Sequence, residues 1–177
     1  MKTLTLLRHA KSSWDDPVAR DFDRPLNAKG RRAAAMIGRQ LKSLDMGFDH
    51  ILASPAIRVI ETLDEVWGGY GRRLEPVWDK AMYLASGVSL LDLVQTLPDD
   101  AEHVLMVGHN PGLEDLTLDL TMDGELRERV EDKYPTATVA QMTLPIDRWA
   151  EAKSNSATLV AFIRPRDLDP TLGPDTP

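Results

Sequence analysis

The chain contains no cysteine, which excludes disulfide bonds, a thiol nucleophile and zinc or iron–sulfur sites ligated by cysteine. It also lacks any apolar run near the roughly 18 residues that a membrane-spanning helix needs. The short apolar stretch after Met1 is not followed by the small-residue cleavage site of a signal peptide. These absences lead us to expect a cytoplasmic protein that makes no membrane contact.

Positive charge is scarce. There are 21 Lys and Arg against 28 Asp and Glu, so the formal net charge is -7, which argues against a partner made of nucleic acid. Any anion site must therefore be a local cluster of cations. The 177 residues are 42% hydrophobic and 28% charged, as in a globular domain. We expect one domain over residues 1–164 and a tail, rich in proline and aspartate, over residues 165–177 without packed structure of its own.

Apolar runs alternate with amphipathic segments along most of the chain. Helices are expected after Asn27, which fits an N-cap, at Ser54-Pro55, after Ser86 or Ser89, and around Leu113. Residues 11–27 are expected to form a long loop, and residues 121–135 an irregular charged segment. The predicted strands cover residues 4–7, 48–53, 74–78, 103–107, 136–144 and 157–163. This alternation predicts an α/β fold, a three-layer α/β/α sandwich around a mostly parallel sheet.

Three predicted strands end in residues that can bind an anion. The first ends in Arg8 and His9, the second is followed by Ser54 and then Arg58, and another ends in His109. Parallel strands direct their carboxyl ends to one edge of a sheet, so we expect these side chains to meet. Guanidinium groups match the oxygens of phosphate, which is the natural ligand. Each residue alone has a structural explanation that is at least as good, and only their joint placement favours a site.

Four segments carry a shared pattern. Residues 8–15 read Arg-His-Ala-Lys-Ser-Ser-Trp-Asp, residues 25–30 read Pro-Leu-x-x-x-Gly, residues 54–62 read Ser-Pro-x-x-Arg-x-x-Glu-Thr, and residues 107–109 read Val-Gly-His. In this order they resemble the motifs of the histidine phosphatase superfamily, which has the phosphoglycerate-mutase-like fold. The short chain, its Asp-x-x-Arg-Pro-Leu loop and its Gly-His-Asn-Pro segment are most similar to SixA-type phosphohistidine phosphatases.

The resemblance implies a two-step mechanism with a histidine nucleophile. His9 would attack phosphorus and form a phosphohistidine on the enzyme, which water then hydrolyses. Arg8, Arg58 and His109 would bind the phosphoryl oxygens and stabilise their charge in the transition state. Ser12 would add a hydrogen bond to the phosphate. The resemblance implies no metal and no other cofactor.

The chain departs from the family pattern at three places. Ala10 replaces a glycine, and Asp15 replaces an asparagine. Residues 83–87, Tyr-Leu-Ala-Ser-Gly, stand where many members carry the glutamate general acid in Glu-x-x-x-Gly. A protonated imidazole leaves as a neutral ring with a pKa of about 6.5, so phosphohistidine needs little acid assistance. If an acid is used, Asp21 is the first candidate, ahead of Asp23 and Asp15; the alternative for Asp21 is a solvated loop carboxylate.

The leading hypothesis is a phosphatase that removes the phosphoryl group from phosphohistidine on a partner protein. The first alternative is a phosphatase of small phosphomonoesters, and the second is a non-catalytic module that binds a phosphorylated ligand. A mutase is disfavoured because the glutamate is absent.

Overall fold

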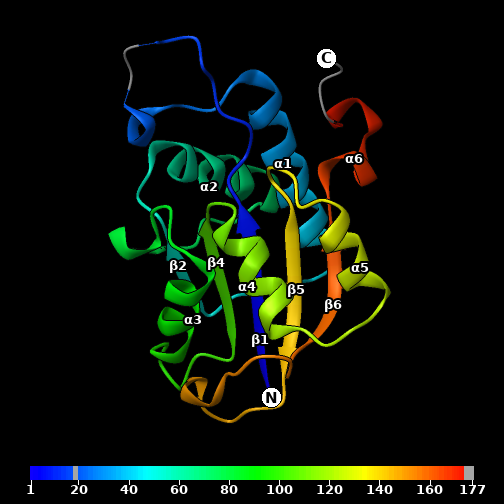
Figure 1. Ribbon diagram of the computed structural model, residues 1–177. Helices are drawn as coiled ribbons and strands as arrows, with labels where there is room; N and C mark the ends of the chain where they lie inside the picture. Colours follow the sequence, from blue (N-terminus) through cyan, green and yellow to red (C-terminus); the bar gives the residue numbers. More distant parts are fainter. Residues whose placement is uncertain (18–19, 174–177) are drawn as a thin grey trace.

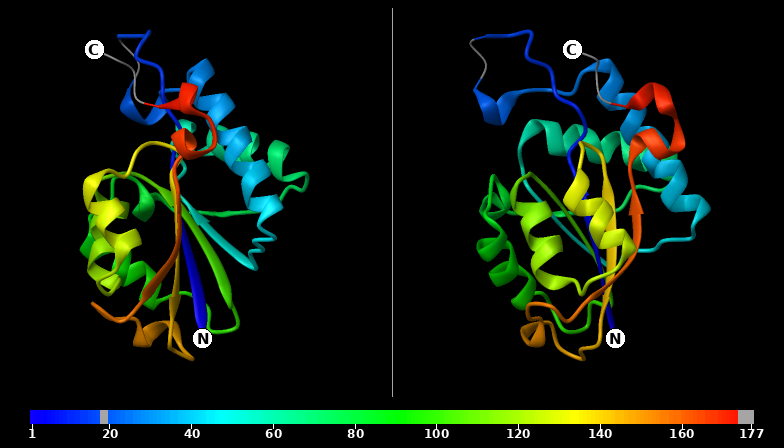
Figure 2. Two further views of the ribbon diagram at one scale, coloured as in Figure 1. Left: turned by 90° about the vertical axis from the view of Figure 1, so that its right-hand side faces the viewer. Right: turned by 45° about the vertical axis from the view of Figure 1, so that its right-hand side comes forward.

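A mixed six-stranded sheet forms the centre of the molecule, with helices on both faces (Figures 1 and 2). The structure, a computed structural model, describes residues 1–17 and 20–173. The strand order is β3-β2-β4-β1-β5-β6; the pairs among β3, β2, β4 and β1 are parallel, and β5 is antiparallel to both neighbours. The strands are β1 (Lys2–Arg8), β2 (His50–Ala53), β3 (Val77–Trp78), β4 (His103–Gly108), β5 (Val139–Leu144) and β6 (Thr158–Ile163). The predicted α/β fold with a mostly parallel sheet is confirmed.

Each face of the sheet carries its own hydrophobic core. In β1, Leu4 and Leu6 are buried in one core and Leu7 in the other. Both faces of this central strand are covered, which explains its nearly continuous apolar sequence. The helices of one face are α1 (Ala28–Ser43) and α2 (Ile57–Tyr70), and those of the other are α3 (Gly87–Gln95), α4 (Gly112–Leu120) and α5 (Glu125–Asp132).

Two of the predicted helix starts are confirmed and one is wrong. The side chains of Asn27 and Ser86 each accept a hydrogen bond from the backbone N–H three residues later, at 2.8 and 3.1 Å, and cap α1 and α3. Helix α2 begins at Ile57 rather than at Ser54-Pro55. Ala56 is its N-cap, and the Ser54 hydroxyl lies 2.8 Å from Nε2 of His109.

Two segments carry more regular structure than their sequences predict. Helix α5 forms within the segment expected to be irregular; Val130 is its one buried residue, too little for an apolar periodicity. After β6, α6 (Pro165–Leu168) and a 3-10 turn at Pro170–Leu172 lie beside α1, with Leu172 in the core that α1 also covers (Figure 2). Residues 165–173 thus differ from the expected unpacked tail because the side chains of Pro165 and Leu172 are buried. Residues 174–177 lie outside the described residues.

The carboxyl ends of β1, β2 and β4 meet at one edge of the sheet, as predicted. Arg8 pairs with Gly108, and Ala53 pairs with Val107. The loop that follows β1 closes on itself through a bridge between Ser12 and Leu26. Among the described residues, no helix is both long and apolar enough to cross a membrane.

Candidate active site

His9 is fixed directly after β1 with one ring nitrogen turned to the backbone. The backbone N–H of His9 donates to the carbonyl oxygen of Gly108 at 3.0 Å, and the ring Nδ1 lies 2.7 Å from the carbonyl oxygen of Ala10. A carbonyl only accepts, so Nδ1 carries the proton and Nε2 keeps a free lone pair. Burial lowers the pKa of His9 to about 3 despite the Ala10 hydrogen bond, and the positive charge of Arg58 contributes to the decrease. At neutral pH, His9 is a neutral imidazole with an unprotonated Nε2.

The peptide after His9 is held by α1 and α2. The N–H of Ala10 donates to Oγ1 of Thr62 at 2.9 Å, and the Thr62 hydroxyl donates to the carbonyl oxygen of Arg58 at 2.6 Å. Ala10 is fully buried without a positive φ, so its Cβ causes no backbone strain. In α1, a Cβ on Gly30 would lie 2.2 Å from the carbonyl oxygen of Lys11. The glycine of the Pro-Leu-x-x-x-Gly motif therefore lets α1 pack directly on the loop behind His9.

Arg58 and His109 form a buried pair opposite His9. Nη2 of Arg58 lies 3.3 Å from Nδ1 of His109, and the His9 and His109 ring centroids are 5.3 Å apart. Arginine only donates, so Nδ1 of His109 is the acceptor and Nε2 donates to Oγ of Ser54. Burial, followed by the charge of Arg58, lowers the pKa of His109 to about 4, against the opposing charge of Asp21. His109 is therefore neutral before an anion arrives.

Arg8 is anchored beside this pair by the segment that leads into β5. Its Nη1 donates to the carbonyl oxygen of Tyr134 at 3.0 Å, and burial lowers its pKa. Ala137, at a φ of 58°, donates its N–H to the carbonyl oxygens of both Arg8 and His9 at 3.1 and 3.0 Å. The left-handed backbone of Ala137 is costly for alanine and holds the end of β1 in place. Sequence reasoning missed Ala137, because no local pattern marks a left-handed alanine.

Asp21 reaches the site from the long loop and binds Arg58. Its Oδ2 accepts from Nη2 of Arg58 at 2.9 Å and from the Tyr83 hydroxyl, while its Oδ1 accepts from Nη2 of Arg24 at 3.0 Å. Burial alone would raise the pKa of Asp21, but the hydrogen bonds from Tyr83, Arg58 and Arg24 lower it to about 2. In this arrangement Asp21 is ionised and has no proton to donate. Its role as a general acid stays a prediction.

Ser12 is tied to the same loop contacts. Its Oγ accepts from Nη1 of Arg24 at 2.7 Å, and the guanidinium of Arg24 stacks on Trp14 with its Cζ 3.4 Å from the ring centroid. Ser12 is 8% exposed and here supports Arg24, so its contact with phosphate also stays a prediction. The other two acid candidates are not brought to Arg58: Asp23 pairs with Arg20 at 2.8 Å, and Asp15 is exposed.

Sequence reasoning did not assign Arg24 or Tyr83 to the site. Tyr83 stands at the start of the segment that lacks the family glutamate, and its ring lies edge-on to His109 with centroids 5.2 Å apart. Its position in that segment was the available signal. Arg24 lies three residues after Asp21, a spacing compatible with an ion pair. Across residues 1–17 and 20–173, no group of three or more His, Cys, Asp or Glu is placed to hold a metal ion.

Comparisons with known proteins agree on one family. The sequence model of the histidine phosphatase superfamily (branch 1) matches residues 4–82. The uncharacterized protein Rv1276c of Mycobacterium tuberculosis is 30% identical over 164 residues, which cover 90% of this chain and 100% of that protein. The uncharacterized protein ML1117 of Mycobacterium leprae is 30% identical over 167 residues, with 90% and 100% covered.

Two similar solved structures are SixA proteins described as phosphohistidine phosphatases. The one from Agrobacterium tumefaciens is 28% identical with a TM-score of 0.77, covering 92% of this chain and 97% of its own. The one from Nakamurella multipartitia is 27% identical with a TM-score of 0.78, covering 93% and 96%.

Proposed function

Because the chain belongs to branch 1 of the histidine phosphatase superfamily, we propose that it is a phosphatase that hydrolyses phosphohistidine on a partner protein. The observation that carries the proposal is the protonation state and position of the His9 ring. Its Nδ1 proton is held by the Ala10 carbonyl, and its free Nε2 lies on a ring that neighbours the Arg58–His109 pair. A neutral nucleophile beside a buried guanidinium fits attack on an anionic phosphoryl group.

In the first step, Nε2 of His9 attacks phosphorus while the bond from phosphorus to the substrate imidazole breaks. If the substrate imidazole is protonated before the P–N bond breaks, it leaves as a neutral ring. The phosphoryl group is then bound to Nε2 of His9. In the second step, water attacks phosphorus, inorganic phosphate leaves, and His9 is regenerated with the water proton passing to phosphate or solvent. Arg8 and Arg58 hold the phosphoryl oxygens in both steps. The bound dianion raises the pKa of His109 and favours its imidazolium form.

Two observations about possible proton donors support a preference for a substrate with a P–N bond. Residues 83–87 contain no carboxylate, and Asp21, the carboxylate that meets Arg58, has its pKa lowered to about 2. An alkoxide leaving group needs a proton in the transition state, whereas a protonated imidazole does not. The similarity to two SixA proteins described as phosphohistidine phosphatases supports the same substrate class. A protein substrate is further supported by a short chain without long insertions that would cap the site.

The test compares turnover of a phosphohistidine-bearing protein with turnover of sugar and nucleotide monophosphates. We expect a higher kcat/KM for the phosphohistidine protein; faster turnover of the monoesters would replace this proposal with the first alternative. Covalent labelling of His9 is tested with a radiolabelled phosphoryl donor and an alkaline denaturing quench, because phosphohistidine is labile in acid. His9→Gln should abolish both label and turnover while thermal unfolding stays cooperative. Unlabelled wild-type protein without turnover would indicate the non-catalytic module.

A further inference from the structure

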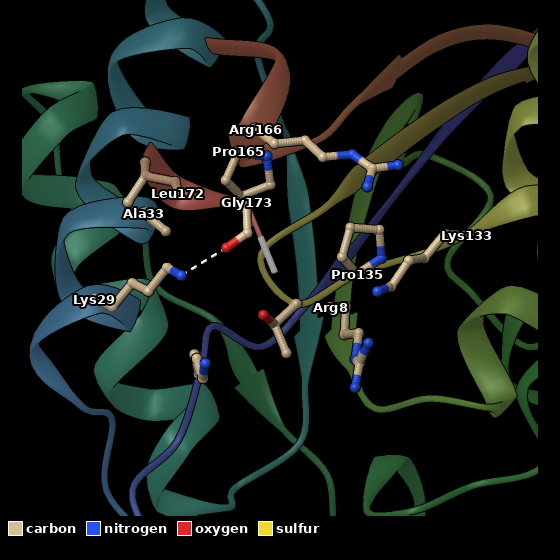
Figure 3. A pocket seen from close by; sticks show the side chains of 11 residues that line it. Arg8, Lys29, Ala33, Lys133, Pro135, Pro165, Arg166, Leu172 and Gly173 are labelled. Atoms are coloured by element: carbon tan, nitrogen blue, oxygen red, sulfur yellow. Dashed lines mark hydrogen bonds between the residues drawn. The ribbon is translucent and has the colours of Figure 1, made fainter. Parts of the chain in front are cut away.

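A cavity of about 400 Å³ opens beside the site, between α1, the C-terminal segment and the chain that leads into β5 (Figure 3). Its lining contains five cationic side chains and no carboxylate, and its other walls are formed by alanine, proline, threonine, leucine and glycine. The cationic residues are Arg8, Lys11, Lys29, Lys133 and Arg166. Such a cluster in a chain with a net charge of -7 is a local concentration of positive potential.

Three of the pocket cations, Arg8, Lys133 and Arg166, differ from an arginine such as Arg127, which pairs with Glu131 on its own helix. Within the part of the chain that the structure describes, no carboxylate lies within salt-bridge distance of Arg8, Lys133 or Arg166. Cations that face a common cavity without neutralising carboxylates repel one another, and an anion between them removes that repulsion.

Arg8 belongs both to the basic pocket and to the proposed phosphoryl site. Its Nη1 is bound to the Tyr134 carbonyl, while its buried Nε has no hydrogen-bond partner among the described residues. An unpartnered buried donor is costly, and an added acceptor would remove that cost. Arg8 is therefore the residue that links an anion in the basic pocket to the proposed phosphoryl site.

The apolar walls of the basic pocket also fit the methylene groups of a bound side chain. Lys29 on α1 donates to the carbonyl oxygen of Gly173 at 2.6 Å, which ties the C-terminal segment to α1 across one side (Figure 3). Pro165 and Leu172 are buried beside this contact, and Ala33 completes the apolar wall. Methylene groups of a side chain would pack against these residues while a carboxylate meets the cations.

We propose that the basic pocket binds an aspartate or glutamate side chain of the partner protein, near the phosphohistidine that His9 attacks. This inference rests on the proposed function. The cavity has the volume of a small-ligand site, enough for one or two acidic side chains and too small for a packed helix. An ionic contact in the basic pocket would select partners with an acidic residue close to the phosphohistidine.

The test uses Lys133→Gln and Arg166→Gln, alone and combined, because neither residue belongs to the proposed catalytic machinery. The matched double control is Arg72→Gln with Lys153→Gln, two exposed cations outside the basic pocket. The substrates are phosphohistidine peptides with glutamates near the phosphohistidine, the same peptides with glutamines, and phosphoramidate. We expect the pocket double variant to raise KM for the acidic peptide about tenfold. The pocket double variant should keep its kcat, and its activity on the neutral peptide and on phosphoramidate, within about twofold of the wild-type values. The control variant should stay within the same range for every substrate.

Equal effects of the pocket variants on acidic and neutral peptides would overturn the inference. Binding of the unphosphorylated acidic peptide, measured by calorimetry, keeps this test independent of turnover. We expect wild type to bind it and the pocket double variant to lose that binding; wild type that binds no acidic peptide overturns the inference even if phosphoramidate is hydrolysed. Citrate is measured in the same way. If citrate binds more tightly than the peptide, and the pocket double variant loses citrate binding, a small polyanion would replace the partner side chain as the proposed ligand. Wild type that binds the acidic peptide but hydrolyses no phosphohistidine would overturn only the proposed function.

Discussion

Arg58 donates to Asp21 twice, from Nη1 to the backbone carbonyl oxygen at 2.6 Å and from Nη2 to Oδ2 at 2.9 Å. Arg58 is 2% exposed, so its terminal nitrogens have little access to water as an alternative partner. A phosphoryl group bound by this guanidinium would take the same donors. On the proposed function, the substrate and the Asp21 carboxylate would therefore compete for Arg58, and the loop that carries Asp21 would move when the phosphoryl group binds.

We predict that Asp21→Asn lowers KM for the phosphohistidine substrate several-fold and leaves kcat within about twofold. The amide keeps the shape of the side chain but removes the negative charge that competes with phosphate. Steady-state kinetics on a phosphohistidine protein measure both constants. Asp23→Asn is the matched control, because Asp23 pairs with Arg20 instead of Arg58. A fall in kcat of tenfold or more, largest for monoesters, would instead identify Asp21 as the general acid.

The contact between Asp21 and Arg58 also shows where sequence reasoning stops. Arg8, His9 and His109 follow buried strands, so the apolar pattern and the rule for parallel sheets predict their convergence. Asp21 lies in a loop without periodicity, 37 residues from Arg58, and only the folded chain brings them together.

The same limit applies to segments with weak apolar patterns. Helix α5 has one buried residue, Val130, and α6 spans only Pro165–Leu168. Their stability comes from tertiary contacts rather than from local propensity. The basic pocket likewise depends on cations contributed by segments as distant as Lys11 and Arg166, which have no shared motif.

Arg58→Lys should reduce kcat/KM for phosphohistidine at least about 100-fold while the protein stays folded. Lysine keeps the charge but loses the planar fork that reaches both Asp21 and His109. Steady-state kinetics give the rate, and circular dichroism checks the fold. Arg31→Lys is the matched control, because Arg31 makes a partly exposed ion pair with Glu61 of α2 at 3.3 Å. Activity of Arg58→Lys near that of wild type would remove Arg58 from the phosphoryl site.

Gly30→Ala should destabilise the protein by about 2 kcal/mol or more, because the new Cβ would overlap the carbonyl oxygen of Lys11 at 2.2 Å. Both atoms belong to packed backbone, so α1 and the loop behind His9 must separate. Gly68→Ala is the matched control: it lies inside α2 with nothing within 4 Å of its Cβ position, so alanine should be neutral or slightly stabilising. Urea unfolding measures both variants, and equal stabilities would contradict the close packing of α1 on the loop.

Acid should weaken the fold through the two buried histidines before it protonates Asp21. The folded-state pKa of His9 is about 3 and that of His109 about 4, both below the ordinary value of 6.5. Between these values the unfolded chain binds more protons than the folded one, so stability falls as the pH falls through this range. From pH 7 to 5 each histidine contributes a loss of at most about 2 kcal/mol. The Asp21 carboxylate, with a pKa of about 2, adds no loss between pH 7 and 5, because its stabilising contribution is lost only as the pH falls below its ordinary value of 3.8.

Urea unfolding at pH 5 and pH 7 tests this difference in wild type, His9→Gln and His109→Gln. We expect each variant to lose less stability than wild type between the two pH values, because glutamine does not titrate. His103→Gln is the matched control, since His103 is exposed at the start of β4. The same pH dependence in wild type and both buried variants would show that His9 and His109 are not held neutral by the fold, and would remove the neutral imidazole on which nucleophilic attack by His9 depends.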